Sequence, residues 1–591
     1  MRVLVGKAAV DLADDALLGV GGEARVFRWG DTAVKLWHAD VPALAVRRAK
    51  IASFPPGLPA EVVGPRELVR DESGQILGFT MPVVEAADEL VRLSQRAWRE
   101  GVVSSSSVVA LFRNLRTVLS ALHERGVVVG DLNDGNVLFS GARPWLIDAD
   151  SMQWEGFPCV VAHERFLDPR LYGADLAKGA AFTPGSDWYA YAVMLFASLL
   201  YVHPFGGIHR GLPTLLRRAE ARRSILGPEV QVPRAAVHYQ VLPDDLLGWF
   251  EDVFERDRRE AVPTRLLDLD WQRCRCGTEH ARPLCPECAP LARGDAVRTV
   301  TRVNGRCTSH TIVETRGRVL CAAVQGKLRF VVEEDGVIRR EDGSIVTRGA
   351  LEPGMRFAIS DGSTWIGKGG VLLRLENERA LARTATGTLG RDPMFDACST
   401  ACYRVHGEWL EEVVTGARVG KVLDGQTWLR VGERLGFGFY RAGLCTFFFL
   451  FRVGKAGLTD VRVEAPQGKI VEADAVFDDS HVLLSLATEQ GGRRRDCTYL
   501  VGQDGRVIAH AEGLPCGGKA LFGGHVVCAT DDGLLSLGVD RSSGLLVPKK
   551  LFSDTRPFVE QGFRILPGPG GAVFVVTTKD ITEVRHDAAS S

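Results

Sequence analysis

The clearest periodic pattern in the chain lies in residues 107–125, where apolar residues recur at intervals of three and four positions. This spacing places them on one face of an α-helix, and Gly126 follows as a stop signal. Short apolar runs then occupy residues 127–129, 137–139 and 145–147. Each run is too short for a helix and rich enough in branched residues for a strand. The pattern predicts an amphipathic helix followed by three short strands.

From about residue 295 onward, short apolar runs alternate with turns that contain glycine and aspartate, such as residues 503–505 and 531–533. The runs recur irregularly at about 40 residues, and propeller blades repeat at roughly 40–50 residues. We therefore expect an all-β domain over residues 295–588, with a β-propeller favoured and a pair of smaller sandwiches or barrels as the alternative. The most aromatic run, residues 447–451, should be a buried strand of this domain.

Composition narrows the class of protein. The 591 residues carry 72 Lys and Arg against 73 Asp and Glu, a formal charge of −1, which argues against a nucleic-acid or membrane-surface binder. The apolar share of 46% is ordinary for a globular protein. The most apolar stretch, residues 189–202, is shorter than the roughly 20 residues of a membrane span, and the first residues lack the apolar core of a signal peptide. A cytoplasmic protein is expected.

A glycine-rich turn at residues 19–22 lies between two apolar runs. Because glycine has no Cβ, such a hairpin can lie over phosphate groups and present backbone N–H groups to them. Lys35 ends an apolar run nine residues after Val26 and could reach beneath the turn toward an anionic ligand. Each feature alone is common, and a lone lysine of this kind is more often a solvated strand residue.

The stronger signal is a set of acids and amides. Asp131 and Asn136 flank a tight turn, and Asp148 closes a later apolar run. Carboxylate and amide oxygens are the hard ligands that Mg²⁺ prefers beside phosphate oxygens, and Asp131 could orient and deprotonate an attacking hydroxyl. Asp and Asn also cap ordinary turns. The ordered set of glycine turn, Lys35, Asp131, Asn136 and Asp148 nevertheless favours phosphoryl transfer.

This set resembles the protein kinases over residues 15–265, in order and in spacing. The resemblance implies an α+β protein-kinase fold with two lobes, residues 1–85 and 86–270. It implies that Asp131 is the catalytic base, that Asn136 and Asp148 hold Mg²⁺, and that Asp187 braces the catalytic loop. The residues implied to bind ATP are Gly19, Val20, Gly21, Gly22, Val26, Ala33, Lys35, Asn136 and Asp148.

The sequence motifs at residues 130–136, 146–151 and 203–207 are similar to those of a divergent bacterial group of eukaryotic-like (Hanks-type) serine/threonine kinases with C-terminal zinc ribbons. Such kinases occur with von Willebrand A-type and phosphatase partners in tellurite-resistance-type modules. The resemblance implies ATP- and Mg²⁺-dependent transfer of phosphate to Ser or Thr hydroxyls of a partner protein. The C-terminal β-domain would then recruit or regulate partners.

The chain departs from the kinase pattern at several positions. Gly130 replaces the usual arginine, Asn133 the usual lysine, and Arg170 the glutamate that normally follows proline. The helix predicted over residues 42–52 contains no acid, so Lys35 lacks its usual partner. Asp150 is open between a further metal ligand and a turn residue. A pseudokinase scaffold and a small-molecule hydroxyl kinase therefore stay as alternatives.

Without that arginine, phosphate on the hydroxyls between Asp150 and Asp187 would find no fixed cation. Activity is therefore expected to depend on partners that bind the β-domain or the arginine-rich residues 217–223, rather than on phosphorylation of this segment. A solvated helix face is the simpler interpretation of those arginines.

A cysteine cluster separates the two halves, and a zinc ribbon is predicted over residues 273–291. Two close pairs of thiolates provide the tetrahedral S₄ set that Zn²⁺ accepts, and a segment this short needs the metal to fold. Two disulfides are the alternative, which a reducing compartment disfavours. His280 is a surplus ligand candidate, and the other cysteines should be small buried apolar residues. The predicted structural Zn²⁺ ligands are Cys274, Cys276, Cys285 and Cys288.

Overall fold

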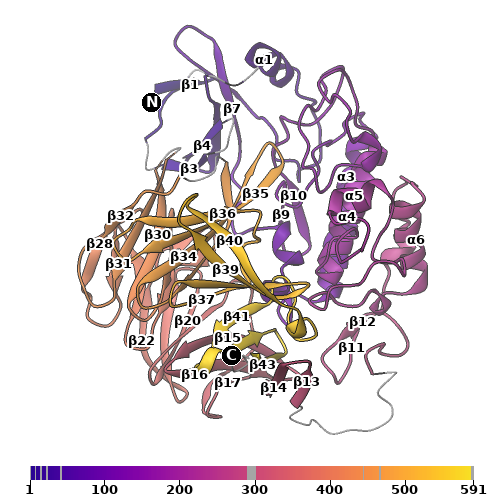
Figure 1. The fold of residues 1–591 in the computed structure, drawn as a ribbon. Coiled ribbons are helices and arrows are strands. Elements are labelled where there is room, and N and C mark those ends of the chain that lie inside the picture. The colour runs from indigo at the N-terminus through magenta and orange to yellow at the C-terminus, as the bar shows by residue number, and fades with distance from the viewer. Residues whose placement is uncertain are drawn as a thin grey trace.

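The structure is a computed structural model that describes residues 2–6, 8–13, 16–20, 24–39, 41, 43–288, 301–442, 445–464 and 468–586. Its regular structure is mostly β, with few helices (Figure 1). Gly21, Gly22 and the last part of the predicted ribbon, residues 289–291, lie outside the described residues.

The chain begins with a seven-stranded antiparallel sheet, here called the N-terminal sheet, in the order β2-β1-β6-β7-β5-β4-β3. Val34 and Leu36 of β5 are buried in its core beside Phe27 of β4. One helix, α1 (Leu44–Ala52), contacts β7. The strands are β1 (Arg2–Val5), β2 (Ala8–Asp11), β3 (Leu17–Val20), β4 (Ala24–Trp29), β5 (Thr32–Trp37), β6 (Leu68–Arg70) and β7 (Ile76–Pro82).

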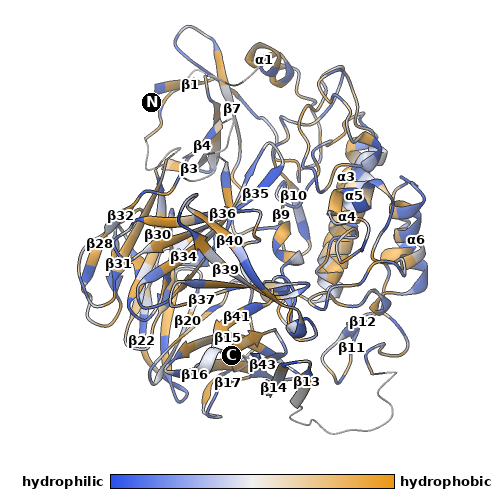
Figure 2. Cartoon of the chain, viewed as in Figure 1, coloured by the Kyte–Doolittle hydropathy of each residue, from blue (hydrophilic) through white to orange (hydrophobic). Residues whose placement is uncertain are grey.

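Residues 86–270, here called the helical part, surround the largest hydrophobic core, in which α3 packs against α4 and α4 against α6. Figure 2 shows apolar residues concentrated along α4. The helices are η2 (Leu90–Ser94), α2 (Arg96–Arg99), α3 (Ser105–His123), η3 (Pro169–Leu171), α4 (Pro184–Leu200), α5 (Leu215–Glu220), η4 (Tyr239–Val241), α6 (Asp244–Glu255) and η5 (Thr264–Leu267). A small sheet joins β8 (Asp88–Glu89), β9 (Val137–Ser140) and β10 (Arg143–Leu146).

The helix predicted over residues 107–125 is present as α3, two residues earlier at each end. Ser104 sets its start, because the Ser104 side chain accepts a hydrogen bond from the N–H of Ser107 (3.1 Å). The prediction of a strand at residues 127–129 was wrong. Only Val128 forms a bridge there, to Gln153, because the N–H of Val129 donates to the carboxylate of Asp187 instead of to a neighbouring strand.

The second half of the chain, here called the ring, consists of sheets in which most neighbouring strands are antiparallel and consecutive in sequence; β36 and β40 form a parallel pair. Strands β15, β19, β25, β29, β33, β37 and β41 contact one another in that order, and β41 contacts β15 again, so the sheets close a circle. The first and last strands of the ring lie in one sheet, where β14 pairs with β43 (Cys307 opposite His586). The predicted hairpin turns at residues 503–505 and 531–533 join β35 to β36 and β38 to β39.

The strands of the ring follow in sequence order. The first blocks are β13 (Thr301–Asn304), β14 (Cys307–Glu314), β15 (Arg318–Gln325), β16 (Lys327–Glu334), β17 (Val337–Arg340), β18 (Ile345–Arg348), β19 (Arg356–Ser360), β20 (Ser363–Lys368), β21 (Val371–Glu376), β22 (Arg379–Ala385), β23 (Thr388–Leu389), β24 (Asp392–Pro393), β25 (Phe395–Ala397), β26 (Cys402–His406), β27 (Trp409–Glu412) and β28 (Arg418–Lys421). The later blocks are β29 (Thr427–Val431), β30 (Leu435–Ala442), β31 (Cys445–Arg452), β32 (Thr459–Val461), β33 (Lys469–Phe477), β34 (His481–Gln490), β35 (Arg493–Gly502), β36 (Val507–Glu512), β37 (Lys519–Phe522), β38 (His525–Thr530), β39 (Gly533–Asp540), β40 (Leu545–Phe552), β41 (Arg564–Pro567), β42 (Val573–Val576) and β43 (Asp580–His586), with short helices η7 (Ser553–Thr555) and η8 (Pro569–Gly571).

The aromatic run 447–451 lies in β31. Phe448, Phe449 and Phe451 are buried as predicted, whereas Phe447 is 47% exposed and stacks on Tyr440 of β30. The ring thus has an apolar core of its own, separate from that of the helical part.

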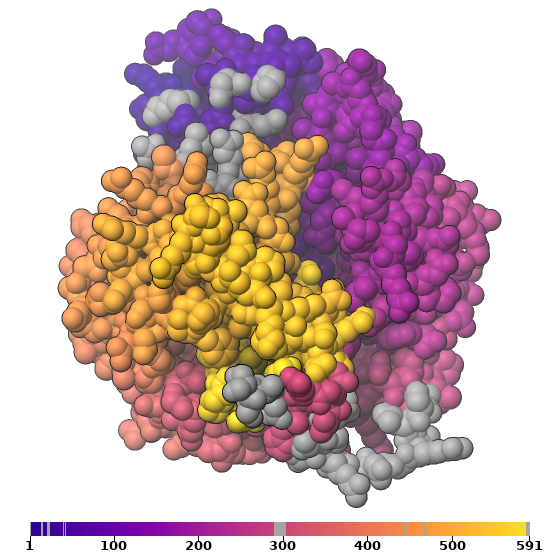
Figure 3. Space-filling model, viewed as in Figure 1, coloured from indigo at the N-terminus to yellow at the C-terminus, as the bar shows by residue number. Residues whose placement is uncertain are grey.

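The ring lies against the helical part (Figure 3). At one side of this contact, charged residues of the ring meet β8 and η2, next to β9. These ion pairs are Arg391–Asp88 (2.7 Å), Arg92–Asp392 (2.5 Å) and Lys469–Glu89 (3.0 Å). At another side the N–H of Arg234 donates to the carboxylate of Glu560. Among the described residues, no helix has both the length and the apolarity needed to cross a membrane.

Candidate functional site

The loop between α3 and β9 carries Asp131 and Asn136, and its own polar side chains fold it. The carboxamide oxygen of Asn133 accepts the N–H groups of Gly135 (3.0 Å) and Asn136 (3.1 Å), which closes a tight turn. The Asn136 side chain then donates back to the carbonyl of Asp131 (3.0 Å). The predicted Asp–Asn pair is therefore brought together at one turn, directly before β9.

Three donors surround the Asp131 carboxylate. Its Oδ1 accepts from the N–H of His163 (2.8 Å) and from Asn133 Nδ2 (3.1 Å), whereas Asn136 Nδ2 lies 3.4 Å from Oδ2. Burial raises the pKa of Asp131 to about 6, against the opposing effect of these hydrogen bonds. A carboxylate with this pKa is suited to accept a proton near neutral pH.

Asp148 lies beside Asn136 and contacts Lys35. The N–H of Ile147 donates to the carbonyl of Asn136 (3.0 Å), so the end of β10 runs next to the Asp131 turn. Asp148 itself has a left-handed backbone, with φ of 59°. Such strain in a non-glycine residue is typical of functional positions. Lys35 Nζ lies 2.5 Å from Asp148 Oδ1.

A second carboxylate, that of Asp150, lies 2.6 Å from Lys35 Nζ. The side chains of Lys35 and Asp150 are 13% and 7% exposed. Burial alone would lower the pKa of Lys35, but the two carboxylates outweigh it and raise that pKa. The charge of Lys35 lowers the pKa of Asp148, whereas burial raises that of Asp150. Asp150 is thus neither an exposed turn residue nor without a partner.

Lys35 lies on β5 between β4 and β7, opposite Val26 and Phe79. Ala33, two residues earlier, is on the same face of the strand. Val26 is in turn opposite Gly19 of β3, so β4 lies between the Lys35 strand and the described part of the glycine turn. The backbone of Val20 is described as the end of β3, opposite Arg25.

Helix α1 contributes a cation, not an acid. Lys50 Nζ donates to the carbonyls of Ser151 (3.0 Å) and Pro158 (3.2 Å) and lies 4.8 Å from the ring centre of Trp154. The helix thereby holds the segment that carries Asp150. Glu61, an acid that follows this helix in sequence, pairs with Arg143 (3.4 Å). The signal for Asp150 in the sequence was its place two residues after Asp148.

Asp187, in the first turn of α4, braces the Asp131 loop as expected. Its fully buried carboxylate accepts the N–H groups of Val129 (2.8 Å) and Gly130 (2.9 Å) and contacts His123 Nε2 (2.8 Å). Gly130 has a positive φ of 74°, and a Cβ there would lie 2.7 Å from Cys159 Cβ. The position usually occupied by arginine therefore has no room for a side chain.

Sequence reasoning missed a second brace. The buried carboxylate of Asp168 forms a two-pronged ion pair with Arg259, at 2.7 and 3.0 Å, and also binds Arg170 (2.8 Å). The chain therefore has an acid before Pro169 rather than after it. The kinase pattern places this acid directly after the proline, so the pattern gave no signal for Asp168.

The arginines of residues 210–223 do not share one solvated face. Arg218 is buried and donates to the carbonyls of Phe205 (2.8 Å) and Leu212 (2.7 Å). Arg222 pairs with Asp257 (2.9 Å). Helix α5 covers only Leu215–Glu220, so the predicted face is divided between buried and paired side chains.

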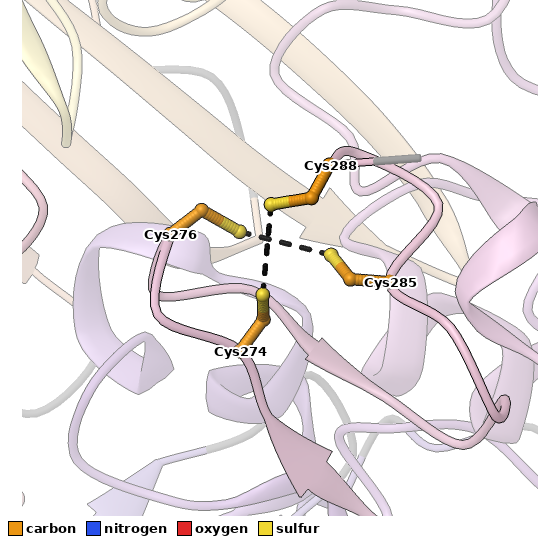
Figure 4. A group of neighbouring side chains, drawn as sticks. All are labelled: Cys274, Cys276, Cys285 and Cys288. Carbon is orange, nitrogen blue, oxygen red and sulfur yellow. Dashed lines mark hydrogen bonds between the residues drawn. The ribbon is translucent and has the colours of Figure 1, made fainter. Parts of the chain in front are cut away.

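The four clustered cysteines point toward one another from two turns (Figure 4). All four sulfur atoms lie within 4.8 Å of each other, and the Cys274–Cys288 and Cys276–Cys285 distances are 3.6 and 3.7 Å. A disulfide would need about 2.05 Å. Zn–S bonds of about 2.3 Å in a tetrahedron place the sulfurs about 3.8 Å apart. The chemistry and spacing of these donors therefore fit a zinc ion.

Cys274 and Cys276 lie in the turn between β11 (Gln272–Arg273) and β12 (Glu279–His280), and Cys285 and Cys288 follow β12. This region, residues 272–288, is here called the cysteine knuckle, and it contacts both neighbouring parts. The Glu279 carboxylate accepts the N–H of Ser105 (2.8 Å) at the start of α3. On the other side, a Cβ on Gly277 would lie 2.7 Å from the carbonyl of Arg316 in the ring. His280 is buried, and its Nδ1 contacts the carbonyl of Arg282 (2.9 Å).

Two curated proteins are similar to part of the chain. Both are named protein kinase YegI; the protein from Escherichia coli O157:H7 is 25% identical and that from strain K12 is 26% identical, each over 320 residues. The matched region covers 46% of this chain and 48% of each relative, so the chain spans about half the length of these relatives. No protein-family model matches the chain. The likeness supports the predicted relation to divergent bacterial kinases.

We predict one zinc ion per chain in protein purified without chelator, lost in the Cys285→Ser, Cys288→Ser double variant. Thiolates bind structural zinc with about 10–16 kcal/mol near neutral pH, so the variant should also unfold at lower temperature. Elemental analysis measures the zinc, and Cys445→Ser, at an exposed cysteine of the ring, is the control. Zinc-free wild-type protein would rule out the metal site.

We predict that Asp187→Ala lowers the free energy of unfolding by at least about 2 kcal/mol, because two buried N–H groups lose their acceptor. Denaturant unfolding measures the change. Asp245→Ala, an exposed acid in the first turn of α6, is the control and should stay near wild type. Equal midpoints for the two variants would contradict the bracing role.

Proposed function

We propose that the chain is an ATP- and Mg²⁺-dependent protein kinase that transfers the γ-phosphate to Ser or Thr hydroxyls of a partner protein. One observation carries the proposal: Lys35 of β5 is buried between the carboxylates of Asp148 and Asp150. These two residues follow β10, and the end of β10 runs beside the Asp131–Asn136 turn. A lysine, metal-binding oxygens and a carboxylate of raised pKa are the groups that phosphoryl transfer requires.

Each residue has a role in this proposal. Gly19, Val20 and Val26 would cover the nucleotide together with Gly21 and Gly22, Ala33 would line its pocket, and Lys35 would bind its phosphates. Asn136 and Asp148 would hold Mg²⁺, which supplies positive charge to the phosphate oxygens. Asp131 would accept the hydroxyl proton. Its Oδ2 is the oxygen available for this, because Oδ1 already accepts two hydrogen bonds.

The main argument for a pseudokinase was that the helix after Lys35 contains no acid. Asp150 supports activity instead, because its carboxylate lies 2.6 Å from Lys35 Nζ and supplies Lys35 with a second acidic partner. Lys50 of α1 anchors the same segment. Asn133 still leaves the transferred phosphate with one cation fewer, since its buried side chain serves the turn. A pseudokinase scaffold, or a kinase for small-molecule hydroxyls, is the second candidate.

The proposal extends to the fold of the chain. We infer that the N-terminal sheet with α1 and the helical part are the two lobes of a kinase fold, and that the ring is a β-propeller. The closed contact order from β15 to β41 supports the propeller. In this proposal the cysteine knuckle binds a structural zinc, and the propeller recruits protein partners. The resemblance suggests von Willebrand A-type and phosphatase proteins as these partners.

Regulation through the segment between Asp150 and Asp187 is not favoured, because three of its four hydroxyls serve the fold. The Ser151 hydroxyl donates to the carbonyl of Asp148 (2.8 Å), and Thr183 and Ser186 form the capping box of α4. Phosphate on Ser186 would remove the hydrogen bond that its hydroxyl donates to the carbonyl of Thr183 (2.6 Å). This supports control by partners of the ring.

We predict that Asp131→Asn lowers the single-turnover rate about 10²–10⁴-fold, the usual value of general-base assistance, while ATP affinity stays near wild type. Transfer of label from γ-labelled ATP with Mg²⁺ to casein and to heat-inactivated cell extract measures the rate. Asp175→Asn, an exposed acid of the same part, is the control. An unchanged rate in Asp131→Asn would remove Asp131 from this role.

We predict that Asp148→Ala weakens ATP binding in the presence of Mg²⁺ and changes it little in EDTA, because the carboxylate would hold the ion that bridges the phosphates. Calorimetric titration with and without Mg²⁺ measures both affinities. A wild-type chain that binds ATP equally well in both conditions would favour the pseudokinase.

A further inference from the structure

The hairpin formed by β34 and β35 of the ring lies on the helical part close to Asp131. Gly492, in its turn, contacts residues 162–164, which follow the Asp150 segment. The N–H of Glu164 donates to the carbonyl of Gly492 (3.3 Å). The two parts of the chain are more than three hundred residues apart in sequence, since the His163–Glu489 separation is 326.

A polar contact reinforces the backbone contact. Glu489 Oε1, at the end of β34, lies 3.1 Å from His163 Nε2, and the His163 side chain is 9% exposed. Burial opposes a charge on His163, but the hydrogen bond and charge of Glu489, with the charge of Asp134, outweigh it, so the pKa of His163 is raised. The pair is therefore a shielded, charge-assisted contact rather than a solvated surface pair.

The steric contact is tighter still. A Cβ built on Gly492 would lie 2.1 Å from the carbonyl oxygen of Ala162 and 2.7 Å from His163 Cα. Only a residue without a side chain lets the hairpin approach so closely. Gly491, the preceding residue, also has a positive φ (57°), but a Cβ there would meet nothing within 4 Å.

The held segment acts directly on the candidate base. The N–H of His163 donates to Asp131 Oδ1 at 2.8 Å. With Asn133 on the same oxygen, this bond fixes the rotation of the carboxylate and leaves Oδ2 with one long contact, to Asn136 Nδ2 (3.4 Å). A general base must have such a fixed orientation, because a displacement of about 1 Å can cost 10²-fold in rate.

We propose that the β34–β35 hairpin of the ring is part of the catalytic apparatus, with Glu489 and Gly492 as positioning residues that act on Asp131 through the backbone of His163. The inference rests on the proposed phosphoryl transfer by Asp131. The ion pairs at β8 and η2 hold the ring beside the same loop system, since β8 pairs with β9. A domain remote in sequence thereby completes the orientation of the base.

The test compares Gly492→Ala with Gly491→Ala in the full chain. Both variants place a side chain at a positive φ, but only the first collides with Ala162. We expect kcat to fall about 10–100-fold in Gly492→Ala, with the KM for ATP within about twofold of wild type, and Gly491→Ala to stay near wild type. The probe is γ-labelled ATP with Mg²⁺, with casein and heat-inactivated cell extract as acceptors.

Glu489 has its own controls. Glu489→Ala should lower kcat, and Glu489→Gln, which keeps an acceptor for His163, should recover most of it. Glu472→Ala removes a carboxylate that pairs with Arg494 on the same sheet and should have no such effect. Hydrogen exchange of residues 160–167 should rise in Gly492→Ala and Glu489→Ala alone, whereas thermal unfolding reports any general loss of structure.

Equal kcat and equal exchange in Gly492→Ala and Gly491→Ala would overturn the inference, and so would a gain of activity in Gly492→Ala, because the hairpin would then be inhibitory. A wild-type chain that transfers no phosphate to any acceptor would overturn the proposed function itself. The two failures are therefore distinguishable.

Discussion

The buried ammonium group of Lys35 is the constraint on which the arrangement of the N-terminal half depends. It comes from the N-terminal sheet, whereas its two carboxylates, Asp148 and Asp150, follow β10 in the helical part. A buried charge costs several kcal/mol unless it is paired, and removal of one partner typically costs about 3–5 kcal/mol. The sheet cannot move away from β10 without that cost. Lys50 joins α1 to the same segment, so strand and helix hold it together.

The segment that follows, residues 159–163, passes between two glycines. Gly130 lies on one side, where a Cβ would be 2.7 Å from Cys159, and Gly492 of the ring lies on the other, where a Cβ would be 2.1 Å from the Ala162 carbonyl. The departure from the kinase pattern at Gly130 therefore has a steric cause. The space that an arginine side chain would need is filled by the segment that supplies the His163 N–H to Asp131.

Local patterns in the sequence predicted the parts of the structure that depend on near neighbours. The 3.6-residue period located α3, the cysteine spacing located the four-sulfur cluster, and the Asp131–Asn136 spacing marked a turn that Asn133 closes. The partners of Lys35 and Arg259 were not predictable in this way. Asp150 and Asp168 reach them through folding of the segment between β10 and α4, which residue spacing along the chain does not describe.

The contact of Glu489 with His163 was even less predictable from the sequence, because it depends on how the closed ring sits on the helical part. The repeated hairpins favoured a propeller, but they do not indicate which hairpin of the circle meets the helical part. The same is true of the two ends of the ring, which share a sheet because β43 returns to β14. Sequence alone therefore suggested a domain that recruits partners and gave no sign that it touches the candidate site.

The contacts between the ring and the helical part differ in how they respond to displacement. The ion pairs at β8 and η2 are partly exposed, with Lys469 and Glu89 at 55% and 43%, and such pairs contribute about 0–1 kcal/mol and tolerate small shifts through water. The contact of Gly492 with Ala162 is backbone against backbone, where repulsion rises steeply over a few tenths of an ångström. A small rotation of the ring would thus leave the ion pairs largely intact and still move the His163 N–H relative to Asp131. A partner bound to the ring could alter the orientation of the base without breaking the domain contact.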